Sequence, residues 1–185
     1  MNNYGKFFVD FLTPFFEGLI SIFKSFFAGI FEMFNIIKYL EVIEKYKELG
    51  CDYSHVCCLY STAPFVTSES LKQAFSKLIE GNRDCIFPAV AFSYPIQRSL
   101  IESTDGKAVM KWPEFRYSRS QDLEPFYHDA GQFYFYTKKY LEEGNGLGEG
   151  NCEMLILSEL EVQDLDTIVD WKLAEMKYKI IHNED

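Results

Sequence analysis

The sequence has little positive charge. Its 18 Lys and Arg residues stand against 28 Asp and Glu residues, which gives a formal net charge of -10 over 185 residues. A chain this acidic has no evident basic patch that could neutralise phosphates. Duplex nucleic acid is therefore excluded as a partner. A ligand that carries phosphate would need a metal ion. Because 48% of the residues are apolar, intrinsic disorder is excluded too, and one compact domain, alone or with an appendage, is expected.

Cysteine is sparse and lacks a metal-binding pattern. The five cysteines are odd in number and form neither a C-x-x-C pair nor the spacing of a zinc site. Cys57 and Cys58 lie in an apolar run, where free thiols act as small hydrophobic groups. Free thiols indicate a reducing compartment, and no secretory signal pattern opens the chain, so we expect a cytoplasmic protein. The motifs G-x-S-x-G, H-E-x-x-H and G-x-x-x-x-G-K-[ST] are also absent.

A continuous apolar run long enough to span a membrane, about 18 residues, is absent as well. Ten of the 18 Phe residues nevertheless lie between Phe7 and Phe34, in apolar doublets three or four residues apart. This period predicts an amphipathic N-terminal helix within residues 7–37. Its charges balance, whereas helices that bind anionic lipid usually carry excess Lys and Arg. The helix is therefore expected either at a membrane surface, or against the rest of the chain or a second copy in a homo-oligomer, or as a frayed appendage.

Residues 1–38 sum to zero charge and residues 39–185 carry the whole -10. We therefore predict two parts, an amphipathic Phe-rich segment at 1–38 and a domain at 39–185. In the domain, short apolar runs alternate with stretches of helical period, which predicts an α/β fold with a mainly parallel sheet. The predicted strands are residues 55–60, 85–90, 132–136 and 154–157, and the predicted helices are residues 39–50, 67–80 and 167–181.

A long polar excursion covers about residues 93–120, with Pro95 and Pro113 and a hairpin signal at Asp105-Gly106. Because excursions beyond strand ends usually build the ligand pocket of an α/β domain, we expect chemistry there.

Asp164 and Asp166 form a D-x-D sequence that follows an apolar run and precedes a helix. In an extended segment, carboxylates two residues apart project to the same side, so both could reach one Mg²⁺ ion. The alternative is that Asp166 or Thr167 only caps the last helix, and spacing alone favours this alternative.

Two further groups of residues could serve a ligand. Arg119, in a polar loop, suits a bidentate grip on a carboxylate, although a solvated loop charge is the simpler interpretation. His128 and Asp129 are adjacent and would point in opposite directions in an extended segment, so they predict no catalytic dyad. The glycine-rich stretch 144–150 has neither a Lys nor a helix start after it, which favours a flexible surface loop over a phosphate loop.

Four segments together resemble one enzyme family. They are VCCLYSTAPFVTSESLKQAF (56–75), FSYPIQRSL (92–100), RSQDLEPFYHDAGQFY (119–134) and VQDLDTIVDWKLAEMKY (162–178). In this order they are similar to the C-terminal two thirds of cytidylyltransferases that activate nonulosonic acids, above all the pseudaminic acid cytidylyltransferases, with the sialic acid enzymes as broader relatives. The resemblance implies a Rossmann-like nucleotidyltransferase sheet, incomplete here.

The resemblance also implies a reaction and the residues that serve it. The anomeric hydroxyl of the sugar acid would attack the α-phosphate of CTP and release pyrophosphate, with Mg²⁺ neutralising the phosphates. Asp164 and Asp166 match the family's metal-binding D-x-D, which reverses the preference drawn from spacing alone. The residues implied to bind the substrate are Tyr60, Thr62, Ala63, Gln97, Arg98, Arg119 and Gln132, with Arg119 on the sugar carboxylate.

The chain departs from the family at its N-terminus. Family members begin with a strand and a loop of the pattern A-R-x-G-S-K-x-x-x-x-K-N that holds CTP, and nothing in residues 1–38 resembles it. In this fold the first strand lies beside the strand matched by residues 56–60, so that strand is expected to have an unpaired apolar edge. We expect the N-terminal helix to cover part of this surface. Family activity, a non-catalytic remnant and a membrane-surface or assembly module acting through the helix all remain open functions.

Overall fold

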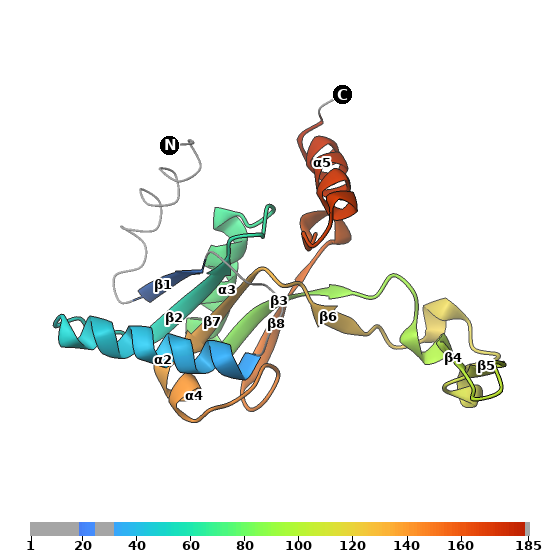
Figure 1. Cartoon of the computed structure of the whole chain (residues 1–185), viewed down its shortest axis with the longest axis horizontal. Coiled ribbons are helices and arrows are strands. Elements are labelled where there is room, and N and C mark those ends of the chain that lie inside the picture. The colour runs from blue at the N-terminus through green and yellow to red at the C-terminus, as the bar shows by residue number, and fades with distance from the viewer. Residues whose placement is uncertain (1–18, 25–31, 184–185) are drawn as a thin grey trace.

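The computed structural model describes residues 19–24 and 32–183, with side chains from residue 38 onward. A six-stranded sheet occupies the centre, with helices on both of its faces (Figure 1). The order along the sheet is β1 (Leu19–Lys24), β2 (His55–Tyr60), β7 (Phe133–Thr137) and β3 (Cys85–Ala91), and β3 also pairs with β6 (Tyr127–Asp129) and β8 (Cys152–Leu157).

The predicted α/β class is confirmed, and the sheet is mixed, with β1, β2, β3 and β8 running in one direction and β6 and β7 in the other. β1 with β2 and β3 with β8 are parallel, whereas β7 runs antiparallel to both of its neighbours, β2 and β3. No crossover helix lies between β3 and β6, so the chain returns antiparallel to β3. β7 then continues in the direction of β6.

The two faces of the sheet carry separate cores. Along β7, Phe133 and Phe135 pack with the residues of α3 (Ser68–Glu80), while Tyr134 and Tyr136 pack beneath α2 (Glu32–Glu48) and α4 (Lys138–Glu142). This is the alternation expected of a strand covered on both sides. The apolar run that predicts β2 is buried for the same reason, and Cys57 and Cys58 are buried free thiols, as expected.

The helix boundaries follow their capping residues. α3 begins after Thr67, which forms a capping box with Ser70, and α5 (Ile168–His182) begins after Thr167, which forms one with Asp170. Both predicted helices are confirmed. The predicted helix at 39–50 is also present but starts earlier, at Glu32, so α2 runs without a break through residue 38. The division into 1–38 and 39–185 stays a prediction.

The N-terminal segment differs from the predicted amphipathic helix. Residues 19–24 form the strand β1, which pairs in parallel with the whole of β2, from Leu19 opposite His55 to Lys24 opposite Tyr60. The prediction of helix is therefore wrong at these residues, and the rest of residues 7–31 lies outside the described residues. The physical reason is the edge of β2, whose free N–H and C=O groups a strand can satisfy and a helix cannot.

An arm leaves the sheet after β3 and returns at β6 (Figure 1). Its tip is the predicted hairpin, formed by β4 (Leu100–Glu102) and β5 (Ala108–Met110) around Gly106, whose φ of +77° suits glycine. The arm also contains the 3-10 helices η1 (Ile96–Arg98), η2 (Pro113–Phe115) and η3 (Ser120–Asp122), and η4 (Glu159–Glu161) follows β8. Among the described residues, no helix is long and apolar enough to cross a membrane.

The pairing of β1 with β2 leads to a first prediction. A variant that lacks residues 1–24 should melt several degrees lower and aggregate more readily than the full chain, because the apolar edge of β2 is then left unpaired. Differential scanning fluorimetry and light scattering measure the two effects. A variant that lacks only residues 1–18 is the control, and equal behaviour of the two truncations would show that β1 does not protect β2.

Candidate functional site

The site forms where one antiparallel strand is interrupted. β6 pairs with β3 at Ala89 opposite Asp129, and β7 pairs with β3 at Ile86 opposite Phe135, so the register shifts by three residues between them. The interruption at 130–132 contains Gly131, whose φ of +62° few other residues adopt. Such bulges bend strands and redirect side chains, and they are common next to active sites.

A cavity of about 510 Å³ opens at this interruption. It lies at the carboxyl ends of β2 and β3, and the segment after β8 closes it. This edge is where open α/β sheets bind ligands. The lining residues are Tyr39, Tyr60, Val90, Ala91, Ser93, His128, Asp129, Ala130, Gly131, Tyr134, Tyr136, Asn145, Leu147, Glu159, Val162, Gln163, Asp164 and Lys177.

Tyrosines form one wall of this cavity. The ring centroids of Tyr60 and Tyr134 lie 5.4 Å apart, and the rings of Tyr134 and Tyr136 stack with centroids 6.2 Å apart. Tyr39 of α2 adds a fourth ring, 6.3 Å from that of Tyr136. Rings of this kind can pack against the apolar face of a sugar or a base.

Asp129 is held rigidly at the cavity. Its Oδ1 accepts a hydrogen bond from the Gly131 N–H at 3.0 Å, and its Oδ2 accepts one from the Tyr134 hydroxyl. Burial, and then the negative charge of Asp129, raises the pKa of Tyr134, so this hydroxyl stays protonated. His128 Nδ1 contacts the backbone carbonyl of Asp129, not its carboxylate. The expectation that these neighbours form no dyad agrees with this geometry.

One residue of the D-x-D pair lines the cavity and the other does not. Asp164 lines the cavity and Asp166 does not, although the two charges interact. Burial raises the pKa of Asp164, and the nearby carboxylates of Asp166, Asp170 and Asp129 raise it further. The capping alternative is confirmed for Thr167, which caps α5, and not for Asp166.

Asp129 and Asp164 fit a Mg²⁺ site only if a bound substrate supplies further oxygen atoms. Asp129 and Asp164 supply oxygen donors to one cavity, and the negative charge crowded around Asp164 is what a cation would relieve. The described part of the chain contains no group of three or more His, Cys, Asp or Glu residues that could hold a metal alone. Mg²⁺ typically uses one or two carboxylates and completes its shell with water and substrate phosphates, so the donors present suit it.

The structure places the predicted substrate residues in two regions. Tyr60 lines the cavity, and Thr62 and Ala63 follow β2 without lining it, Thr62 exposed in a turn and Ala63 half-buried after it. Gln97, Arg98 and Arg119 lie on the arm.

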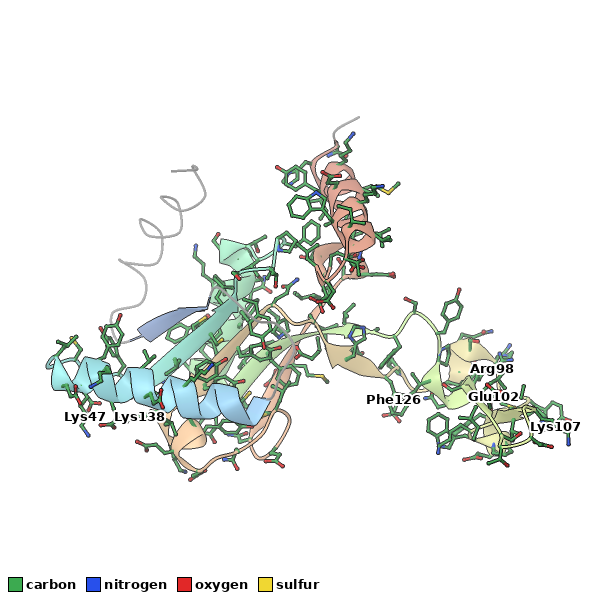
Figure 2. All side chains as sticks on the ribbon, in the orientation of Figure 1. Lys47, Arg98, Glu102, Lys107, Phe126 and Lys138 are labelled. Carbon is green, nitrogen blue, oxygen red and sulfur yellow. The ribbon has the colours of Figure 1, made fainter. Side chains whose placement is uncertain are left out.

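The arm residues make contacts within the arm. Figure 2 shows Arg98 beside the hairpin, well away from the sheet, and its guanidinium lies 3.4 Å from the Ser120 hydroxyl. Arg119 donates two hydrogen bonds to Asp122, at 2.7 and 3.1 Å. Gln97 is buried and donates to the Glu124 carbonyl at 2.8 Å. From residues 93–120 the cavity receives only Ser93, which corrects the expectation that this excursion builds the pocket.

Gln132 lies beside the cavity and is only 1% exposed. Its Nε2 donates to the Glu161 carbonyl at 2.5 Å, and its Oε1 has no hydrogen-bond partner among the described residues. Its backbone carbonyl accepts from the Tyr60 N–H at 2.9 Å. Gln132 thus joins β2, β7 and the segment that leads to Asp164.

Several lining residues were not predicted from the sequence. Tyr134 and Tyr136 could have been found, because they alternate with Phe133 and Phe135 and must share one face. Lys177 has a weaker signal, since it lies three residues after Ala174, the buried residue of α5. Asn145 and Leu147 come from the glycine-rich loop, which the Tyr140 hydroxyl fastens by hydrogen bonds to the carbonyls of Gly146 and Glu149.

Known proteins resemble the chain in sequence. No protein-family model matches the chain. Two pseudaminic acid cytidylyltransferases of Campylobacter jejuni, from serotypes O:2 and O:23/36, are 38% and 37% identical to it over 143 residues, which is 77% of this chain. The resemblance to this family is confirmed. The chain spans 60% of the length of each of these relatives.

Other proteins are less similar. The post-translational flagellin modification protein B of Campylobacter coli is 24% identical over 129 residues, 70% of this chain and 54% of that protein. A CMP:2-keto-3-deoxy-manno-octonic acid synthetase in complex with CTP overlaps 80% of this chain and 68% of its own, with 13% identity and a TM-score of 0.48. A 4-diphosphocytidyl-2C-methyl-D-erythritol synthase of Anaerococcus prevotii overlaps 92% and 77%, with 12% identity and a TM-score of 0.46.

Gln132 provides a test of how the site is held together. Gln132→Met keeps the side-chain volume and removes both the hydrogen bond to Glu161 and the unpaired Oε1. Because the second change offsets part of the first, the free energy of unfolding should fall by about 1 kcal/mol. The melting temperature should fall by roughly 2–4 °C, measured by circular dichroism. Gln73→Met, on the exposed side of α3, is the control. An unchanged melting temperature for Gln132→Met would show that this hydrogen bond does not hold the segment.

Proposed function

We propose that the protein acts in CMP transfer from CTP to a nonulosonic acid, with pseudaminic acid as the first candidate. In this reaction the anomeric oxygen of the sugar acid forms a bond to the α-phosphorus of CTP. The bond from that phosphorus to the oxygen bridging to the β-phosphate breaks, pyrophosphate leaves, and the hydroxyl proton passes to a base. Such chemistry depends mainly on positioning and on neutralising charge.

One observation carries the proposal. Tyr60 and Asp164 belong to two motifs about a hundred residues apart, for which the resemblance implies sugar binding and metal binding, and both line one cavity. The tyrosine wall supplies an apolar surface for a sugar ring, and Asp129 offers a carboxylate whose position is fixed by two hydrogen bonds. A pocket with these two kinds of wall suits a ligand that is partly apolar and rich in hydroxyl groups.

Mg²⁺ belongs to the proposal as the ion that offsets the phosphate charge in a cavity lined by three carboxylates, Asp129, Glu159 and Asp164. Asp164 and Asp129 would hold it, with Asp166 close enough to act on it electrostatically. Hydrogen bonds from backbone N–H groups orient two of these carboxylates, from Gly131 to Asp129 and from Leu165 to Asp164.

A non-catalytic protein that binds the sugar acid is the second candidate. It is favoured by the absence of the pattern A-R-x-G-S-K-x-x-x-x-K-N from the sequence, since the family holds CTP with that loop. In this case the cavity would bind the sugar acid and no pyrophosphate would be released. The two candidates share the same cavity and differ only in turnover.

Pyrophosphate release separates the two candidates. With CTP, Mg²⁺ and pseudaminic acid, the chain should release pyrophosphate, and Asp164→Asn should lower the rate by at least about a hundredfold because the ion loses a carboxylate ligand that lines the cavity. A coupled phosphate assay measures the rate, with the Campylobacter jejuni enzyme as positive control. No release from this chain while the control is active would contradict catalysis and favour the sugar-binding candidate.

Metal binding can be measured without turnover. Because the pKa of Asp164 is raised above its ordinary value, the folded state holds that proton more tightly than the unfolded state does. Its contribution to stability is therefore present at low pH and is lost as the pH rises through the raised pKa. In metal-free protein at neutral pH, Asp164→Asn should thus melt slightly higher than the wild type.

Mg²⁺ should reverse this order. Near pH 7 it should raise the melting temperature of the wild type by roughly 2–4 °C at concentrations well above its Kd, and less as protons compete at lower pH. Asp164→Asn should not respond, while Glu80→Gln, at the exposed end of α3, should respond like the wild type. A Mg²⁺ response that Asp164→Asn retains in full would exclude Asp164 as a ligand.

A further inference from the structure

We propose that Lys177 of α5 binds the carboxylate of the sugar acid in this cavity. The inference rests on the proposed function, because it names the group that recognises the acid. Its starting point is the charge of the wall. Three carboxylates line the cavity, and among the described residues that line it, Lys177 is the one Lys or Arg.

An anionic ligand needs such a group. The cavity already carries Asp129, Glu159 and Asp164, in a chain with a formal charge of -10. A bound carboxylate would add to this repulsion unless a cation faced it in the same cavity. Arg119, the sequence-based choice for this role, lies on the arm and is paired with Asp122.

The geometry of α5 brings Lys177 to the wall. The helix buries Ala174, and Lys177 lies one turn further along the same side. Its Nζ donates a hydrogen bond to the Val162 carbonyl at 2.6 Å, which fixes the ammonium beside the segment that carries Asp164. An ammonium has three donors, so one hydrogen bond to a carbonyl leaves capacity for a carboxylate.

No residue of α5 other than Lys177 lines the cavity. The apolar residues that the sequence places along one side of the helix are turned to solvent, with Val169 60% and Met176 62% exposed. Figure 1 shows α5 standing away from the sheet, joined to it through the segment after β8. Lys172, on the same helix, is exposed and does not line the cavity, so it is a matched control for the charge of Lys177.

The test compares a charged ligand with a neutral one. Dissociation constants are measured by NMR titration of the full chain with pseudaminic acid and with its methyl ester, which differ by one negative charge. The wild type and Lys172→Met should bind the acid at least about tenfold more tightly than the ester, because a charge-assisted hydrogen bond is lost in the ester. Lys177→Met should lose this preference, and Lys177→Arg should keep most of it.

The outcomes separate the inference from the proposed function. If Lys177→Met prefers the acid as strongly as the wild type, or if the wild type binds acid and ester equally, the role of Lys177 is overturned while the proposed function stands. If the wild type binds neither ligand, nor sialic acid as a second probe, the proposed function fails and the inference fails with it. Should Lys177→Met not fold, the comparison of acid with ester on the wild type and on Lys177→Arg decides.

Discussion

The site depends on the break between β6 and β7, where the register against β3 shifts by three residues. Hydrogen bonds extend the strand ladders up to the break on both sides. The Ala130 N–H donates to the Pro88 carbonyl at 3.0 Å, the Tyr60 N–H donates to the Gln132 carbonyl at 2.9 Å, and within the break the Gly131 N–H donates to Asp129. These bonds satisfy backbone groups that the break would otherwise leave without partners. The same arrangement opens the cavity and fixes a carboxylate at its edge.

Electrostatics then decide what the cavity can hold. An acidic wall repels the carboxylate and phosphates of the proposed substrates, so binding requires compensating positive charge from a divalent cation, a lysine or both. Asp164 and Lys177 lie on one stretch of chain, and the Lys177 ammonium donates a hydrogen bond to the Val162 carbonyl of that stretch. Metal binding and recognition of the acid are therefore expected to depend on each other through this segment.

Local rules were sufficient for most elements. The apolar run 55–60, the Thr67 cap and the Asp105-Gly106 turn predicted β2, α3 and the hairpin because propensity, capping and turn chemistry act over a few residues. They failed at residues 19–24, where a helical period lies in a segment that pairs with β2. A period is a local property, whereas the open edge of β2 exists only in the assembled sheet, and it outweighed the local preference.

The sequence by itself determined the α/β class, the resemblance to pseudaminic acid cytidylyltransferases and the choice of Asp164 and Tyr60, because short motifs carry that information. Only the tertiary structure decided that these two residues share a cavity with Asp129 and Lys177, and that Arg119 does not line it. The direction of β7, the break before it and the placement of α5 bring distant segments together. Such contacts depend on strand pairing across the whole chain, which no local pattern records.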